Sequence, residues 1–217
     1  MEQNLYRETG LKSGLMNLQQ ISYYTNVTSF AIVVVLWGVL AWILLSHRAN
    51  GTAAHASHER RSWVGFALQI LSFPIIGAGA RHPMFSPLID EQFALNIAFQ
   101  LIAIGLIVSS VLFEISAFRE LGKQWSLQAR VLEGHQLVKT GAYSIVRHPI
   151  YTALLARLLA TGLTMSHWMT ITIAVVVYII GTKIRTVSEE RLLREAFGDE
   201  FDSWKKRVPA LIPFTKI

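Results

Sequence analysis

The stretch Val27–Ser46 reads VTSFAIVVVLWGVLAWILLS and contains no charged residue. A membrane-spanning helix needs about 20 predominantly apolar residues, which is the length of this stretch. The whole chain agrees with such an environment, because 52% of its 217 residues are hydrophobic and only 16% are charged. A soluble domain has roughly 25% charged residues. The mean hydropathy of +0.40 points the same way. Lipid is therefore the predicted solvent for much of this chain.

Further apolar segments predict additional spans. They are Ser62–Ala80, Gln92–Phe113, Ile150–Met165 and Trp168–Ile184. Only Ser166 and His167 separate the last two segments, which predicts a tight helical hairpin, and a single kinked segment is the alternative. The predicted fold is an all-α integral membrane protein with about five transmembrane helices, organised as a single membrane domain over residues 1–217.

Lys and Arg are unevenly distributed between the two sides of the predicted membrane. In the five-span topology, 16 of the 20 basic residues lie on one side and three on the other. Cytoplasmic loops of membrane proteins are enriched in Lys and Arg, so the basic side is predicted to be cytosolic. The segment 114–149 and the tail after Ile184 then share that side. This rule also explains the pI of about 9.8, and no nucleic-acid partner is expected.

The tail has the sequence pattern of a further helix. Glu189 and Glu190 precede an apolar stripe at helical spacing, and we predict that both carboxylates lie in the first turn of this helix. Gly198 fits a C-terminal cap. Phe201 and Trp204 continue the stripe beside basic residues, which favours a second piece lying on the membrane surface.

The segment His135–Tyr151, HQLVKTGAYSIVRHPIY, leads directly into the fourth span. Pro149 suits the first turn of a helix, where free backbone amides can bind an anionic or polar group. Taken one by one, Tyr, Arg and His are ordinary interfacial anchors. Their combination with Glu189 and Glu190 on the same face indicates a binding site.

Arg157 is unusual because it lies within the fourth span. An ionisable residue at that depth is a functional candidate, and the alternatives are snorkelling to the surface or pairing with Glu114. The tripeptide Arg81-His82-Pro83 lies on the predicted outer face without a following tyrosine, and we assign it no function. The chain has no cysteine and no spaced histidine–carboxylate set, so we predict no metal site.

Residues Leu121 to Pro213 resemble the isoprenylcysteine carboxyl methyltransferases and related small membrane methyltransferases, which include phospholipid N-methyltransferases. The motifs that carry this resemblance are Leu121-Gly122, Trp125-Ser126, His135–Val138, Gly141–Tyr143, Arg147-His148-Pro149 with Tyr151, Glu189-Glu190, Phe197-Gly198, and Arg207-Val208-Pro209 followed by Pro213. One departure is Ala153, where the family usually has glycine.

The resemblance implies S-adenosylmethionine as the cofactor, in a cytosolic-side pocket formed by the loop, the start of the fourth span and the C-terminal helix. The residues implied to line it are His135, Leu137, Val138, Gly141, Tyr143, Arg147, His148, Pro149 and Tyr151. Glu190, with Glu189 as the alternative, would take the cofactor's ammonium group, and Arg185 matches a family arginine near the active centre. Residues 1–113 then form the first three spans and residues 114–217 the methyltransferase core.

We therefore predict methyl transfer to a lipophilic small molecule, lipid or prenylated-cysteine substrate at the membrane. The first choice is the carboxylate of an isoprenylcysteine-like acceptor, with a phospholipid amine or a thiol as alternatives. A carboxylate needs a cation to hold it, for which Arg185 and Arg157 are candidates. An amine needs a base, which His148, Glu114 or Glu189 could supply. A transporter and a non-catalytic scaffold are the alternatives outside this class, but the bare first span does not favour a transporter.

Overall fold

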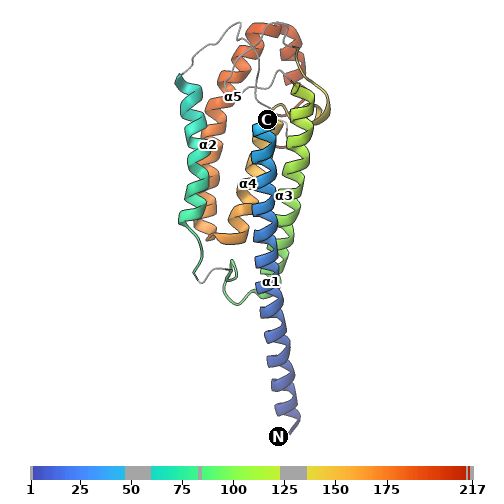
Figure 1. The fold of residues 1–217 in the computed structure, drawn as a ribbon, viewed down its shortest axis with the longest axis vertical. Coiled ribbons are helices and arrows are strands. Elements are labelled where there is room, and N and C mark those ends of the chain that lie inside the picture. The colour runs from blue at the N-terminus through green and yellow to red at the C-terminus, as the bar shows by residue number, and fades with distance from the viewer. Residues whose placement is uncertain (1, 47–59, 83–84, 123–135, 214, 216–217) are drawn as a thin grey trace.

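A computed structural model describes residues 2–46, 60–82, 85–122, 136–213 and 215. These residues form a bundle of five α-helices (Figure 1). The helices are α1 (Glu2–Ser46), α2 (Arg60–Ala78), α3 (Phe93–Leu121), α4 (Pro149–Met165) and α5 (Trp168–Lys205), with a short 3-10 helix, η2 (Gly141–Ser144), before α4.

The helix lengths match a membrane protein. Three segments, Asn17–Ser46, Phe93–Leu121 and Trp168–Lys205, are long and apolar enough to cross a membrane. Ser62–Ala78 and Pro149–Met165 are shorter apolar helices, close to the lower limit of about 17 residues for a span. The predicted all-α membrane fold is confirmed, whereas the division of the chain near residue 113 stays a prediction.

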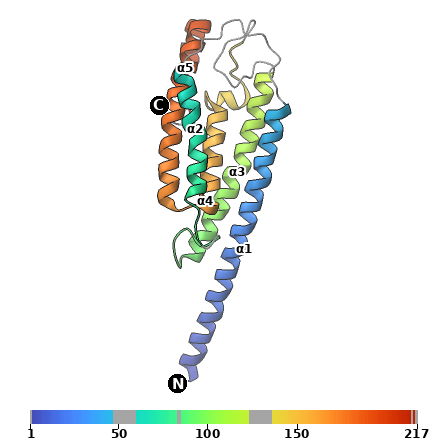
Figure 2. The same ribbon diagram turned by 60° about the vertical axis from the view of Figure 1, so that its left-hand side comes forward.

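The helices alternate in direction, and α2 packs on α5 while α3 packs on α4 and α1. Figures 1 and 2 show that α1, α3 and α5 end at the same end of the bundle at which α2 and α4 begin. The end of α3, the start of α4 and the tail are therefore neighbours, as the predicted topology requires. The side of the membrane that this end faces stays a prediction.

The α4–α5 hairpin is the predicted pair of helices rather than one kinked helix. Its connecting residues are held by α2, because the His167 amide donates to the Gly79 carbonyl at 3.0 Å and the Ser166 hydroxyl donates to the Ile76 carbonyl at 2.5 Å. Arg81, which is buried, donates from Nη2 to the Thr164 carbonyl at 2.7 Å. This donation satisfies a carbonyl that the end of α4 leaves free.

Helices α1 and α3 extend beyond the predicted spans. The first span was predicted to begin at Val27, but α1 begins at Glu2, and α3 continues past Phe113 to Leu121. Hydropathy detects only the apolar part of a helix, whereas backbone hydrogen bonding continues into the polar flanks. The predicted loop from Glu114 is thus partly helical.

The prediction that Glu189 and Glu190 lie in the first turn of a separate helix is wrong. Both lie inside α5, which runs without interruption from the membrane segment to Gly198. Gly198 has a positive φ of 49°, so it interrupts the regular helix as predicted for a cap. Arg194 and Asp202 pair across this bend at 2.7 Å, which fixes the direction of the last helical piece.

The α2–α5 contact depends on two glycines in the middle of the helices. A Cβ atom at Gly65 would lie 2.6 Å from the Gly181 carbonyl oxygen, and one at Gly181 would lie 2.7 Å from the Gly65 oxygen. Small residues permit this close approach between membrane helices. One turn away, the buried Gln69 amide donates to the Thr182 hydroxyl at 2.9 Å.

Replacement of Gly181 by alanine should therefore destabilise the bundle. The added methyl group would meet the Gly65 oxygen and the Leu68 Cβ, the latter at 2.8 Å, so the helices must separate. We expect a loss of about 1–3 kcal/mol, measured by unfolding in detergent. Gly105→Ala is the control, because nothing lies within 4 Å of a Cβ there. Equal stability of the two variants would contradict the close contact.

Candidate active site

The start of α4 is anchored by the C-terminal tail. His148 is the N-cap residue and Pro149 occupies the first turn, as predicted. The Arg147 amide donates to the Pro209 carbonyl at 2.8 Å, and the His148 amide donates to the Ala210 carbonyl at 3.0 Å. These backbone bonds hold the two basic side chains against α5.

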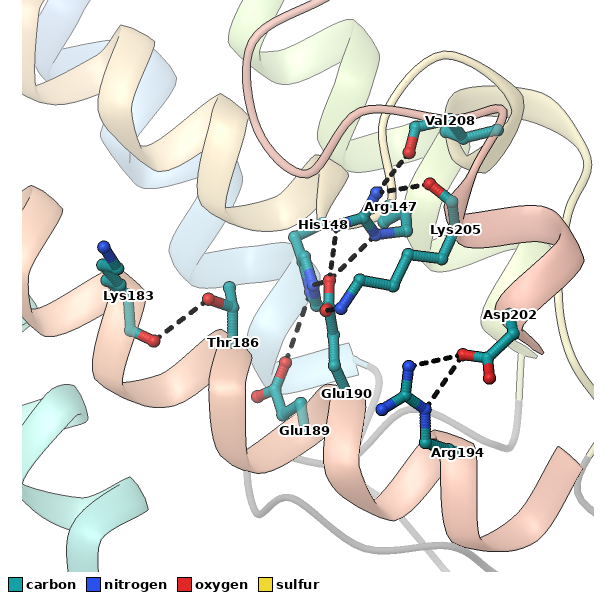
Figure 3. A network of polar contacts seen from close by, with 10 residues as sticks. All are labelled: Arg147, His148, Lys183, Thr186, Glu189, Glu190, Arg194, Asp202, Lys205 and Val208. Atoms are coloured by element: carbon teal, nitrogen blue, oxygen red, sulfur yellow. Dashed lines mark hydrogen bonds and ion pairs between the residues drawn. The ribbon is translucent and has the colours of Figure 1, made fainter. Parts of the chain in front are cut away.

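Glu190 is the centre of the resulting charge cluster (Figure 3). Its Oε1 accepts from Arg147 Nε at 2.8 Å and lies 3.2 Å from His148 Nε2, while its Oε2 accepts from Lys205 Nζ at 2.6 Å. Arg147 Nη1 also donates to the carbonyls of Lys205 and Val208. A single carboxylate thus joins α4, α5 and the tail.

Glu189 organises the adjacent half of the cluster. It accepts a hydrogen bond from the Tyr151 hydroxyl, and Arg185 Nε donates both to Glu189 Oε1 at 3.0 Å and to the Tyr151 oxygen at 2.5 Å. His148 Nδ1 lies 3.5 Å from Glu189 Oε2, so the imidazole bridges the two glutamates. Arg185 and His148 are both buried. The predicted site residues before α4 and those within α5 therefore meet in one place.

The imidazole of His148 carries a positive charge over a wider pH range than a free histidine. Burial disfavours this charge, but hydrogen bonds and charge attraction from Glu189 and Glu190 outweigh burial and raise the pKa of His148. A protonated imidazole donates from both nitrogens and cannot accept a proton. His148 is thus better suited to holding carboxylates than to acting as a base.

This pKa shift predicts a pH-dependent contribution of His148 to stability. A raised folded-state pKa means that the contribution is complete below the unfolded value of about 6.5 and is lost as the pH rises through the folded pKa. The difference in unfolding free energy between the wild type and His148→Gln should therefore shrink as the pH rises from the unfolded pKa through the folded pKa of His148. Unfolding in detergent from about pH 5.5 to 9 would measure it. A constant difference over this range would contradict the charged state of His148.

Apolar residues form one wall next to the charges. Tyr143 packs in a cluster with Phe201 and Trp204, and Leu137 and Val138 pack against it. Burial, together with the charge of Glu189, raises the pKa of Tyr143 and keeps its hydroxyl neutral. The prediction that the Phe201–Trp204 piece lies on the membrane surface is wrong, because both side chains are buried in this cluster.

The turn before η2 brings the predicted loop residues to this wall. Gly141 has a positive φ of 57°, and a Cβ there would lie 2.8 Å from the Glu120 side chain. Thr140 donates to the same carboxylate, so the turn is attached to the end of α3. His135, which was also predicted to line the cofactor, lies outside the described residues.

Arg157 lies apart from this cluster, inside the bundle. Its Nε and Nη2 donate to Glu114 at 3.1 and 2.5 Å, and both side chains have 0% exposure. Nη1 donates to the Leu36 carbonyl at 2.9 Å, and the Trp37 ring centroid lies 5.1 Å from the guanidinium carbon. The pair joins α1, α3 and α4, which favours the predicted alternative of pairing with Glu114. A role of Arg157 at the acceptor stays a prediction.

Arg157 could act as the structural partner of Glu114 or as a ligand of the acceptor. These two roles predict different results when both Arg157 and Glu114 are replaced by apolar residues. Arg157→Met alone should destabilise the protein by about 3–5 kcal/mol, because Glu114 loses its partner. The double variant with Glu114→Leu should recover most of this loss, since it removes both buried charges. We expect the double variant to retain methyl transfer. Normal folding with complete loss of transfer would assign Arg157 to the acceptor site instead.

Lys205 and the backbone of Pro209 and Ala210 were not predicted as parts of the site. The basic run at Lys205 resembled an interfacial anchor, and its distance along the chain from Glu190 gives no hint of contact. The bend at Gly198 reverses the chain and creates that contact. Backbone carbonyls carry no sequence signal.

Known proteins are similar to this chain in amino-acid sequence. A family model described as phospholipid methyltransferase matches residues 99–200, which include α4, η2 and both site glutamates. The protein-S-isoprenylcysteine O-methyltransferase of Schizosaccharomyces pombe is 26% identical over 157 residues, covering 70% of this chain and 66% of that protein. The chain is therefore similar to the phospholipid methyltransferase family and to isoprenylcysteine carboxyl methyltransferases. The predicted resemblance to membrane methyltransferases is confirmed.

Plant members of the family extend the similarity. A probable protein-S-isoprenylcysteine O-methyltransferase of Oryza sativa subsp. indica is 23% identical over 188 residues, covering 82% of this chain and 95% of that protein. Protein-S-isoprenylcysteine O-methyltransferase B of Arabidopsis thaliana is 34% identical over 89 residues, 41% of this chain and 45% of that protein. The identity of 34% to the Arabidopsis thaliana protein thus covers less than half of this chain.

Proposed function

We propose that this methyltransferase transfers a methyl group from S-adenosylmethionine to the carboxylate of a lipophilic, isoprenylcysteine-like acceptor. The observation that carries the proposal is the largely buried charge cluster of Arg147, His148, Glu189, Glu190 and Arg185 at one end of the membrane helices. The names of the fission yeast and plant relatives support the same acceptor class. We further propose that this end faces the cytosol, following the distribution of Lys and Arg.

The balance of charge in the cluster fits anionic ligands. Arg147 and Arg185 are buried and carry two positive charges against the two of Glu189 and Glu190, Lys205 adds a third from its 40% exposed side chain, and His148 adds a fourth when it is protonated. An excess of positive charge in a poorly solvated cluster is stabilised by a carboxylate. Both S-adenosylmethionine and the proposed acceptor carry one. The glutamates can in turn pair with the ammonium group of the cofactor, so the residues present fit it.

When bound, S-adenosylmethionine supplies a methyl group already activated on a sulfonium. A carboxylate acceptor would take that methyl group as an anion, so this chain would need no base to remove a proton from it. The role of this chain is to hold the acceptor carboxylate with Arg185, to hold the cofactor with Arg147 and Glu190, and to exclude water by the Tyr143 wall. Catalysis of this kind rests on alignment of the two reacting groups.

An amine acceptor would place a different demand on the same residues. It must lose a proton, yet His148 is held in its charged form by two glutamates and Glu189 is engaged by Arg185 and Tyr151. A base that is already saturated with donors is a poor proton acceptor. The phospholipid methyltransferase description of the family model makes a phospholipid amine the second candidate. The site favours the carboxylate.

The acceptor class can be tested with purified protein and methyl-labelled S-adenosylmethionine in the presence of a metal chelator. Three acceptors are offered separately: an N-acylated farnesylcysteine, its carboxamide analogue, and phosphatidylethanolamine vesicles. We expect label only on the acid, in a form released by mild alkali as expected for a methyl ester. Label on the phosphatidylethanolamine instead would establish the second candidate. Label on the carboxamide would exclude carboxylate methylation.

Glu190→Gln should weaken the cofactor more than the acceptor. The substitution keeps the size of the side chain but removes a charge-assisted contact worth about 1.5–3 kcal/mol, or roughly ten- to a hundredfold in affinity. Calorimetry with S-adenosylmethionine in detergent would measure this loss. Glu195→Gln on the same helix is the matched control, because its side chain is 60% exposed and pairs only with Arg191 among the described residues. Unchanged cofactor affinity in Glu190→Gln would leave the residue a structural role alone.

A further inference from the structure

Helix α2 lies outside the region matched by the family model, yet it reaches the charge cluster. The matched residues are 99–200, whereas α2 comprises Arg60–Ala78. The guanidinium carbon of Arg185 lies 5.1 Å from the ring centroid of Phe66 on α2. A residue from the N-terminal half of the chain is therefore in contact with the proposed acceptor-binding arginine.

Arg185 contacts two aromatic rings. Its guanidinium carbon lies 5.1 Å from the Phe66 centroid and 5.6 Å from the Tyr151 centroid. A cation within about 6 Å of a ring centroid is attracted by the ring quadrupole, and the attraction grows when the cation is removed from water. Only 5% of Arg185 is exposed, so this attraction acts in a poorly solvated place.

Further rings support both sides of this arrangement. Trp63 packs edge-to-face on Phe66 with centroids 5.8 Å apart, and His148 stacks on Tyr151 at 5.7 Å with an interplanar angle of 16°. Trp63 is 47% exposed at the outer surface of α2. A continuous series of side chains thus runs from this surface through Arg185 to the imidazole that contacts Glu190.

The backbone of α2 is brought to Arg185 by the neighbouring glycine. A Cβ atom at Gly65 would lie 3.1 Å from the Arg185 amide nitrogen and 3.2 Å from its Cβ. Any larger residue would push α2 away from this turn of α5. The close approach brings the Phe66 ring to within contact of the guanidinium.

We propose that Phe66 is a positioning residue that acts through Arg185 and keeps its guanidinium in place for the acceptor carboxylate. This inference rests on the proposed function, in which Arg185 holds that carboxylate. Hydrogen bonds to Tyr151 and Glu189 hold the guanidinium at Nε. Phe66 adds a contact through its ring, which uses no N–H donor of the guanidinium. Loss of the ring should then affect acceptor binding while the cofactor contacts of Arg147 and Glu190 persist.

The first test compares Phe66→Leu with Phe73→Leu. The control makes the same change two turns along α2, where Phe73 packs on Trp37 and Tyr178 and no cation–π contact is found among the described residues. For Phe66→Leu we expect the acceptor KM to rise about two- to thirtyfold, the range for a cation–π contact. The cofactor Kd should stay within about twofold, because charge-assisted contacts such as those of Arg147 and Glu190 remain intact. Phe66→Tyr keeps an aromatic ring and should keep the acceptor KM of the wild type. Phe73→Leu should lower stability with little change in the acceptor KM.

A second test preserves the volume of the side chain. Fluorinated phenylalanines introduced at position 66 weaken the ring quadrupole stepwise at nearly constant size, so they separate the cation–π contact from packing and from folding. The acceptor KM should rise with the number of fluorine atoms. A flat KM across this series, or a KM of Phe66→Leu equal to that of Phe73→Leu, would overturn the positioning role.

Arg185→Gln separates this proposal from the function on which it rests. A large rise in acceptor KM for Arg185→Gln, together with a flat Phe66 series, would leave the proposed function intact and remove the role of Phe66. An unchanged acceptor KM for Arg185→Gln would remove the assignment of Arg185 to the acceptor carboxylate and the role of Phe66 with it.

Discussion

The ion pairs of the Glu190 carboxylate are the interactions on which this end of the described structure depends. The Glu190 side chain is 11% exposed. It pairs with Arg147 at the start of α4 and with Lys205 in the last turn of α5. A carboxylate so poorly solvated requires cationic partners. Those partners in turn require the bend at Gly198, which returns Lys205 to Glu190. The start of α4, the bend and the tail thus meet at one poorly solvated carboxylate.

The charge cluster lies at the polar ends of apolar helices, and this position fits the proposed chemistry. Helices α4 and α5 carry it at their polar ends, while their apolar parts form the membrane core with α2 and α3. A lipophilic acceptor has the same division into an apolar chain and a charged group. In the proposed reaction its chain lies at membrane depth and its carboxylate meets Arg185. The ring of Phe66 connects α2 to this site, since its centroid lies 5.1 Å from the guanidinium carbon of Arg185.

The sequence predicted the spans, and it named most of the residues that the structure brings together in the charge cluster, whose functional roles stay predictions. Hydropathy located all five helices because the apolar content of a span is a local property. The continuation of α3 past Phe113 escaped it, since Glu114 reads as polar until its buried pairing with Arg157 is known. Lys205 and Phe66 were missed because their roles arise from contacts between distant segments. The family motif identified Tyr151 and Glu189 together, and their direct hydrogen bond explains why.

The central claim is that cofactor and acceptor meet at the Glu190 end of the bundle and not at the opposite end, where Arg81-His82 repeats part of the motif. Ultraviolet cross-linking of methyl-labelled S-adenosylmethionine to the intact protein, followed by mapping of the labelled peptides, tests this claim most directly. The account predicts label in peptides that contain Arg147–Tyr151 or Glu189–Lys205, and its loss when unlabelled cofactor competes. Competable label confined to residues 79–92 would contradict it.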